Sequence, residues 1–357
     1  MIQIPYFKKR NKVSFNNHNN FDLVRLFAAL QVAVCHSAGH FEYQNFAITI
    51  LGYFPGVPIF FFVSGFLIYS SYEKSKEIQK PLFNFYQKRF LRLYPALWFC
   101  FLLSIISVWQ SGYFDSVKWD SGKFLAWCLA QASFFQFYNL DFLRGYGVGV
   151  LNGSLWTIAV ELQFYILTPF LYFLLTRSNK TVVFSLVFVL ILINVLNSQL
   201  NDRDNILMKL FYVSFLPWIY MFILGALVYK NEVVLKFIKK TSFLIFLSLY
   251  LLSYFLVKDY GWGNAINPIS YILLACMIIK FAFTAPNLSD SILNRNDLSY
   301  GIYIFHMPIV NYLIYLNING GLGFFICLIS TITISFISWF LIEKKSLSFK
   351  NNALRKI

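Results

Sequence analysis

The sequence contains little charge, and negative charge is especially scarce. Asp, Glu, Lys and Arg make up only 13% of its 357 residues, whereas about 25% is usual in a soluble domain. Basic residues number 30 against 15 acidic ones, which gives a formal net charge of +15. Hydrophobic residues make up 58% of the chain, and long apolar runs separate the basic residues. The composition therefore predicts a polytopic membrane protein and argues against a nucleic-acid binder, which needs a solvated basic surface.

Cysteine is also scarce, and its distribution suggests no special chemistry. The five cysteines stand singly in apolar stretches, with no Cys-x-x-Cys pair and no Cys/His cluster. This spacing supports neither a disulfide framework nor a metal site. We expect the cysteines to act as small buried hydrophobic residues, and we expect no metal cofactor.

Apolar runs long enough to cross a bilayer recur along the chain. A hydrocarbon core of about 30 Å requires roughly 20 mostly apolar residues in a helix. Ten runs meet this description: 21–40, 50–71, 92–110, 153–176, 181–198, 206–229, 241–257, 267–284, 298–317 and 321–342. The sequence thus predicts an all-α polytopic protein with about ten transmembrane helices. An eleventh run, 122–140, is predicted to be a re-entrant or interfacial helix.

The positions of Lys and Arg predict the orientation. If both termini are cytoplasmic and 122–140 does not cross, 22 of the 30 basic residues fall on the inner side and five on the outer side. That asymmetry follows the positive-inside rule. We therefore predict a cytoplasmic N-terminal segment (1–20) without a cleavable signal peptide, a transmembrane domain (21–342) and a short cytoplasmic C-terminal tail (343–357).

The first span carries three ionisable residues on one face. At 100° per residue, Asp22, Arg25 and His36 lie within a narrow arc, and Arg25 and His36 are separated by a rise of about 16 Å. Ionisable groups inside hydrocarbon usually face a bundle interior or a cavity and mark function. The simpler alternative is an Asp22–Arg25 ion pair at the interface.

A polar stripe follows one face of the 153–176 span. It has a carboxylate at its centre and contains Ser154, Thr157, Glu161, Tyr165 and Thr168. A carboxylate at this depth must be paired, hydrogen-bonded or protonated. The stripe either lines a functional cavity or holds helices together by hydrogen bonds.

The 298–317 span carries another polar face. Ser299, Tyr303 and His306 share it, Tyr300 stands beside them, and Pro308 predicts a kink. A histidine in this setting is either a functional group or a packing residue with a hydrogen-bond partner.

Two arginines lie at the predicted cytoplasmic end of the 92–110 span. Arg89 and Arg92 are three residues apart and project together, a pattern that suits phosphate groups. They could equally be positive-inside anchors. Glycine and proline in the 50–71 span predict a loosened helix that either lines a cavity or allows close packing.

Five motifs in order carry a family resemblance over nearly the whole chain, from Phe21 to about Glu343. They are FDLVR (21–25) with His36, FFFVSGFL (60–67), Arg89-x-x-Arg92 before Tyr94-Pro95, SLWTIAVE (154–161) with Phe164-Tyr165, and LSYGIY (298–303) with His306. Together they resemble the acyltransferase-3 family of integral membrane acyltransferases. That family commonly closes with an acidic residue, a basic residue and proline. Here Glu343-Lys344-Lys345 lacks the proline, which we expect to affect only how the last helix ends.

The resemblance implies transfer of an acyl group, usually acetyl from acetyl-CoA, to a carbohydrate hydroxyl. It places the protein in the bacterial cytoplasmic (inner) membrane, with acyl-CoA, a carbohydrate acceptor and the lipid bilayer as partners. The acceptor, the acyl group and the oligomeric state are left open.

Catalysis is assigned to His36 and Glu161. His36 is favoured as general base over a covalent acyl carrier, and Glu161 is expected to orient His36 or the acceptor. The predicted substrate-binding residues are Asp22, Arg25, Arg89, Arg92, Ser154, Trp156, Tyr165, Tyr300, Tyr303 and His306.

A transporter or flippase for a lipid-linked sugar or acyl group, without transferase chemistry, is the main alternative. Ten spans with buried charges suit it, but such folds usually show internal repeats with paired interrupted helices. No such repeat is evident in this sequence.

Overall fold

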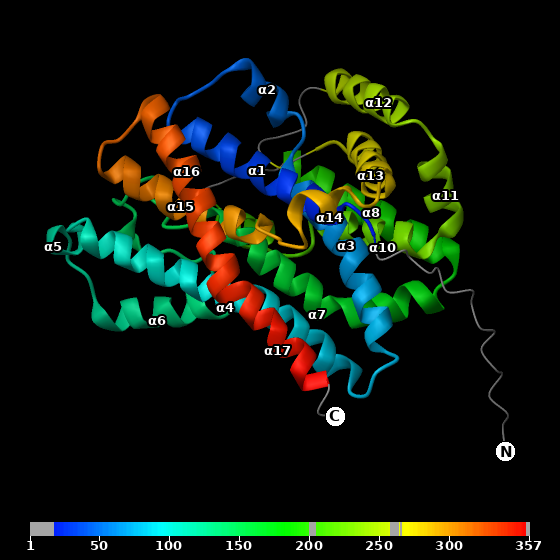
Figure 1. Ribbon diagram of the computed structural model, residues 1–357, viewed down its shortest axis with the longest axis horizontal. Coiled ribbons are helices and arrows are strands. Elements are labelled where there is room, and N and C mark those ends of the chain that lie inside the picture. The colour runs from blue at the N-terminus through cyan, green and yellow to red at the C-terminus, as the bar shows by residue number, and fades with distance from the viewer. Residues whose placement is uncertain (1–17, 200–204, 258–263, 265, 355–357) are drawn as a thin grey trace.

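The computed structural model describes residues 18–199, 205–257, 264 and 266–354, and this part of the chain contains helices and no β-strand (Figure 1). Residues 1–17 of the predicted N-terminal segment lie outside the described residues. The orientation of the chain in the bilayer stays a prediction.

Five helical stretches are long and apolar enough to cross a membrane. They are α1 (Phe21–His40), α4 (Pro81–Gln110), the turn η2 (Gly153–Leu155) with α7 (Trp156–Arg177), α8 (Lys180–Gln199), and Gly320–Phe349. The last stretch runs through α16 (Gly320–Ser338) and a π-helical turn, η3 (Trp339–Glu343), into α17 (Lys344–Leu354). A sixth span forms if α2 (Phe46–Gly52) and α3 (Gly56–Ser75), which meet at a 40° bend, count as one.

Shorter helices occupy the other predicted spans. Three are apolar, α10 (Ile219–Lys230), α12 (Phe243–Leu256) and α13 (Pro268–Phe283). The 17 residues of α15 (Ser299–Tyr315) rise about 25 Å at 1.5 Å per residue. Each of the ten predicted spans thus contains a helix of this set, and the class of all-α polytopic membrane protein is confirmed.

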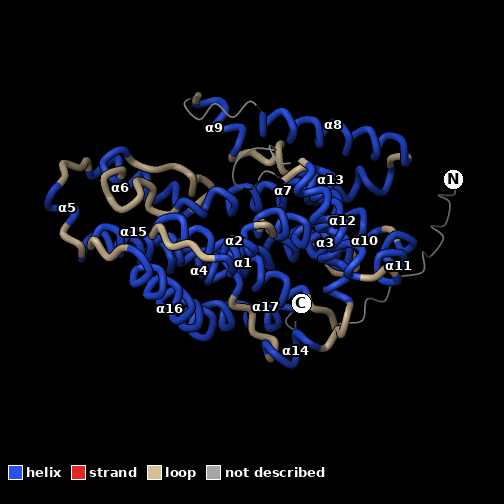
Figure 2. The backbone as a smooth tube through the Cα atoms, turned by 90° about the horizontal axis from the view of Figure 1, so that it is seen from above, coloured by secondary structure: helices blue, strands red, loops and turns tan. Residues whose placement is uncertain are grey.

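The remaining elements are short and connect or flank the spans. They are α5 (Tyr113–Ser116), α6 (Ser121–Ala132), η1 (Asp141–Leu143), α9 (Ile206–Tyr212), α11 (Glu232–Lys240) and α14 (Leu288–Leu293). Figure 2 shows α8 and α9 along one margin of the bundle and α14 at the opposite margin.

The predicted continuous span 206–229 is wrong, because the helix breaks between α9 and α10. Gln163 of α7 stabilises the break by donating to the Val213 carbonyl (3.0 Å) and accepting from the Phe215 amide (2.8 Å). The Asn194 side chain donates to the Pro217 carbonyl (2.9 Å). Side chains from neighbouring helices therefore satisfy the backbone groups that the break exposes.

The predicted helix 122–140 is too long, because α6 ends at Ala132. Its 12 residues rise only about 18 Å, too little to cross a bilayer core. The end of α6 is held against α4, where Tyr94 donates to the Ser133 carbonyl (3.0 Å) and Trp98 to the Ala132 carbonyl (3.1 Å). The short length agrees with the predicted interfacial or re-entrant position, and α6 lies beside α4 in Figure 1.

The two ends of the transmembrane unit also differ from the prediction. α4 begins at Pro81, eleven residues before the predicted span, so Arg89 and Arg92 lie well inside the helix. After α16 the chain stays helical through η3 into α17, past the position of the family's missing proline. α17 packs beside α4, and Ser346 donates to the Leu91 carbonyl (3.1 Å) (Figure 1).

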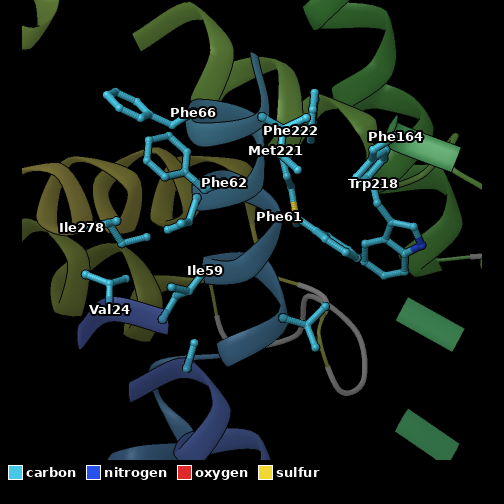
Figure 3. Packing of buried hydrophobic residues seen from close by; sticks show 14 of the residues in the cluster. Val24, Ile59, Phe61, Phe62, Phe66, Phe164, Trp218, Met221, Phe222 and Ile278 are labelled. Atoms are coloured by element: carbon cyan, nitrogen blue, oxygen red, sulfur yellow. The ribbon is translucent and has the colours of Figure 1, made fainter. Parts of the chain in front are cut away.

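The apolar core is built around α3. Figure 3 shows Phe61 on one side of this helix with Trp218 and Phe164, and Phe62 and Phe66 on the other. The ring of Phe61 lies 5.2 Å from that of Phe164. α3 contacts α1, α4 and α7, which carry polar motifs, as well as α10 and α13.

Glycine allows α3 and α10 to approach at backbone distance. A Cβ atom at Gly65 would lie 1.9 Å from the Phe222 carbonyl oxygen, and one at Gly225 would lie 2.2 Å from the Phe62 carbonyl oxygen. The glycine of the Val-Ser-Gly-Phe motif is thus required by the packing of two helices.

We predict that Gly65→Ala lowers the thermal stability of the purified protein in detergent. The added methyl forces α3 and α10 apart, and such overpacking costs about 1–3 kcal/mol. Gly39→Ala is the matched control, because nothing lies within 4 Å of the added methyl group there and alanine favours a helix by up to about 1 kcal/mol. Equal melting temperatures for Gly65→Ala and wild type would contradict the close-packing argument.

Candidate active site

A cavity with a mixed apolar and cationic lining lies where the motif-bearing helices α1, α3, α4, α7 and α15 meet, and Leu347 of α17 also borders it. Its volume is about 170 Å³, below the roughly 300–1,000 Å³ of pockets that enclose a whole small molecule, so it suits one end of a ligand. Four cationic side chains and one carboxylate line it: Arg25, Lys88, Arg89, Arg92 and Glu161. The excess of positive charge favours an anionic group.

Asp297 joins two of these cations. Its carboxylate lies 2.6 Å from Arg25 and forms an ion pair and hydrogen bond with Arg92. The Ser299 hydroxyl and backbone amide donate to it at 2.5 and 3.1 Å. Burial alone would raise the pKa of this carboxyl, but the two guanidinium groups outweigh burial and hold the pKa of Asp297 below its usual range. Asp297 therefore stays ionised and fixes α1 and α4 to the start of α15.

Arg89 is the guanidinium that no carboxylate neutralises directly. It donates to the Ser71 hydroxyl (2.8 Å), and no salt bridge within 4 Å is found for it among the described residues. Its Nε is buried and has no hydrogen-bond partner in that part of the chain. A buried donor without an acceptor is costly, so Arg89 keeps hydrogen-bonding capacity at the cavity that the described residues leave unused.

Glu161 faces the cavity but does not bond to a histidine. It accepts hydrogen bonds from Tyr165 (2.5 Å) and Ser64 (3.1 Å). The Ser64 contact links α7 to the Phe-Phe-Phe-Val-Ser-Gly segment of α3. The carboxylate thus orients two hydroxyl groups at the cavity wall.

His36 lies beside His306 rather than beside Glu161. The His36 Nδ1 and His306 Nε2 atoms are 3.2 Å apart, and the ring centroids 5.3 Å. Neither ring lines the cavity. Tyr303, one turn before His306 on α15, lies between the histidine pair and the cavity. It lines the cavity, and its ring centroid is 6.2 Å from that of His306.

Helices α1 and α15 therefore run parallel and are joined by polar contacts at two levels. Arg25 meets Asp297 near the beginning of both helices, and His36 meets His306 further along both. The predicted shared face of Arg25 and His36 explains how one helix supplies both contacts. The cavity lies at the first level and the histidine pair at the second.

The tyrosines of α15 make specific contacts beside the cavity. Tyr303 is hydrogen-bonded to Thr157 (2.6 Å) and donates to the Ser154 carbonyl (3.2 Å). Tyr300 donates to the Leu93 carbonyl (3.1 Å). These contacts hold α7 and α4 against α15 and fix the cavity wall.

The structure does not bring every predicted site residue to the cavity. Arg25, Arg89, Arg92, Glu161, Tyr165, Tyr300 and Tyr303 line it. Asp22 lies outside and pairs with Arg25 at 3.5 Å. Ser154 is buried and donates to Asn152 (2.7 Å). Trp156 packs against Tyr212, with ring centroids 4.7 Å apart.

Sequence reasoning missed Asp297, Ser64 and Lys88 as members of the site. Asp297 lies in a loop, two residues before a span, so a search for charges within apolar runs passes over it. The available signal was an acidic residue directly before the LSYGIY motif, at a position that commonly caps a helix. Ser64 lies within a quoted motif, for whose span the sequence left cavity lining and close packing open.

A family model described as an acyltransferase domain matches residues 18–340. Nodulation protein 10 of Rhizobium leguminosarum bv. viciae is 27% identical, over 97% of this chain and 98% of its own length. An O-acetyl transferase of Shigella phage Sf6 is 28% identical, over 92% and 96%. A putative peptidoglycan O-acetyltransferase of Bacillus subtilis, YrhL, is 27% identical over 81% of this chain, which spans about half (48%) of that relative. No solved structure matches significantly.

We predict that Asp297→Asn destabilises the protein by about 3–5 kcal/mol, because it leaves the largely buried Arg92 guanidinium without a salt-bridge partner among the described residues and leaves Arg25 with only its longer contact to Asp22. Thermal unfolding in detergent measures the loss. Since the folded-state pKa of Asp297 is lowered, its stabilising effect is present above the unfolded pKa and disappears only as the pH falls through the folded value. The difference between variant and wild type should therefore be constant from about pH 5 to 8.

Asp290→Asn is the control. Asp290 is more exposed, and its contacts with His18 (2.8 Å) and Arg295 (3.7 Å) lie at the surface, so its replacement should change stability by no more than about 0.5 kcal/mol. Equal losses for the two variants would contradict the central role of Asp297.

Proposed function

The chain belongs to the acyltransferase-3 family of integral membrane acyltransferases, and on this premise we propose that it transfers acetyl from acetyl-CoA to a hydroxyl of a cell-surface polysaccharide or its lipid-linked precursor. The proposal places it in the bacterial inner membrane with both termini in the cytoplasm. Two relatives that carry O-acetyltransferase in their names support an oxygen acceptor. The observation that carries the donor assignment is the cationic cavity in which Arg89 has no salt bridge to a carboxylate of the described residues.

The donor's phosphate groups fit the cationic side of the cavity. Arg89 and Arg92 present guanidinium groups there, and planar guanidinium groups bind phosphate oxygens in pairs. Asp297 already engages Arg92, so Arg89 is the principal free donor of charge-assisted hydrogen bonds. The acyl arm would extend past Glu161 and Tyr165 toward Tyr303.

His36 is proposed as the general base at the outer end of this path. Its imidazole takes the proton from the acceptor hydroxyl while the hydroxyl oxygen attacks the thioester carbonyl carbon. The C–S bond then breaks, and the departing thiolate receives the proton from the imidazolium. The acceptor gains an ester, and coenzyme A leaves as the thiol. Glu161 contributes by holding Tyr165 and Ser64 at the cavity wall.

We predict that His36→Ala abolishes acetyl transfer. Membranes incubated with radiolabelled acetyl-CoA should incorporate label into glycan with wild-type protein, and the variant should lose at least the roughly 10²–10⁴-fold that general-base catalysis contributes. His18→Ala is the matched control, because His18 is exposed and bonds to Asp290. An active His36→Ala protein would remove His36 from the mechanism. Substrate movement without label transfer in wild type would favour a transporter.

We predict that Arg89→Ala raises the KM for acetyl-CoA by about 10- to 100-fold, the loss expected from a hydrogen bond to a charged group worth 1.5–3 kcal/mol. The KM of Arg89→Lys should fall between those of wild type and Arg89→Ala, because lysine keeps the charge but lacks the planar guanidinium group. Lys236→Ala, at an exposed position of α11, should leave the KM unchanged. An unchanged KM in Arg89→Ala would reduce Arg89 to a topological anchor.

A further inference from the structure

Two consecutive hydrogen bonds connect His36 through the His306 ring to the backbone of α15. The His306 Nδ1 lies 3.3 Å from the carbonyl oxygen of Ile302, one turn earlier. The other ring nitrogen of His306, Nε2, lies 3.2 Å from the His36 Nδ1. His306 is fully buried, with an exposed fraction of 0%, and does not line the cavity. The sequence predicts His306 as a substrate-binding residue, but a direct contact with substrate does not explain why its ring is buried away from the cavity.

The chemistry of these atoms determines where the protons lie. A carbonyl oxygen only accepts hydrogen bonds, so the His306 Nδ1 must carry the hydrogen. In a neutral imidazole the Nε2 atom then has a lone pair and accepts. Its neighbour, the His36 Nδ1, must therefore donate, which leaves the lone pair of His36 on Nε2.

The surroundings favour neutral rings. Within the described residues, no carboxylate hydrogen-bonds to either histidine, and a buried imidazolium without a counter-charge is costly. Two groups next to the pair are neutral: Tyr303 packs on His306, and the Cys327 thiol lies 3.9 Å from the His306 carbonyl oxygen. The other imidazole nearby is His40, one turn beyond His36 at the end of α1. One arrangement of protons thus satisfies every contact.

We propose that His306 is a positioning residue that fixes His36 as the Nδ1–H tautomer, with the Nε2 lone pair free to accept a proton. The bond has a second effect when His36 takes up a proton, since the His36 Nδ1–H then donates more strongly to His306. The imidazolium is thereby stabilised without a carboxylate. The tautomer follows from the contacts alone, whereas its catalytic importance rests on the proposed function of His36.

The tautomer itself is tested by solid-state nitrogen-15 NMR of histidine-labelled protein in lipid. The chain contains four histidines, and His18→Ala and His40→Ala remove two of the signals. We expect His36 to show a protonated Nδ1 and an unprotonated Nε2 in wild type, and a mixture of tautomers in His306→Leu. A wild-type His36 protonated on Nε2, or the same tautomer in both proteins, would overturn the proposal whatever the activity.

The catalytic consequence is tested by kinetics on membranes. His306→Leu should lower kcat by about 10- to 100-fold, the usual effect of losing a partner that orients a functional histidine, with the KM for acetyl-CoA unchanged. His306→Gln should recover much of kcat, because its amide oxygen can accept from the His36 Nδ1–H. Phe305→Leu, a buried apolar change on the same helix, controls for altered packing and should keep kcat.

These outcomes test the positioning role of His306 separately from the proposed role of His36 as general base. Wild-type kcat in His306→Leu overturns the positioning role. Equal loss in His306→Gln and His306→Leu also overturns it, since that result assigns chemistry to the His306 ring itself. An active His36→Ala protein defeats the proposed base, but leaves the tautomer measurement standing.

Discussion

The structure depends on one carboxylate placed between two guanidinium groups. Charges within a membrane protein are expensive unless paired, and Arg25 and Arg92 belong to two different helices, α1 and α4. Asp297, at the start of α15, binds both and is itself bonded by Ser299. Removing this carboxylate would leave guanidinium charge poorly compensated, which is costly. The ion pairs therefore hold α1 and α4 to the start of α15, and the cavity lies beside them.

Much of the site could be predicted from periodicity, because the spans are long and their polar residues are few. The shared face of Arg25 and His36 follows from helix geometry alone, and both make their contacts from that face. Partners from other helices could not be predicted in this way. Nothing within α7 shows that Glu161 meets Ser64, or that His36 meets a histidine 270 residues away.

The errors in the fold have the same origin. The hydropathy of residues 206–229 predicts one continuous span. The break there depends on Gln163, a polar residue of another helix that satisfies the exposed backbone groups. The α3–α10 contact shows the reverse case. From sequence, Gly65 suggests a loosened helix. In the structure it allows a close contact between α3 and α10, because a side chain there would collide with the Phe222 carbonyl. Local pattern predicts helices well, whereas tertiary contacts decide where they break.

The parallel pairing of α1 with α15 has a consequence for how the protein is made. The two polar contacts that join these helices combine residues from near both ends of the chain. During synthesis, Arg25 enters the bilayer long before Asp297 exists, so until then its salt-bridge partner within the described residues is Asp22 of the same helix. Partial chains therefore lack both the ion-paired cavity wall and the histidine pair. The polar contacts between α1 and α15 therefore form only after nearly the whole chain has been made.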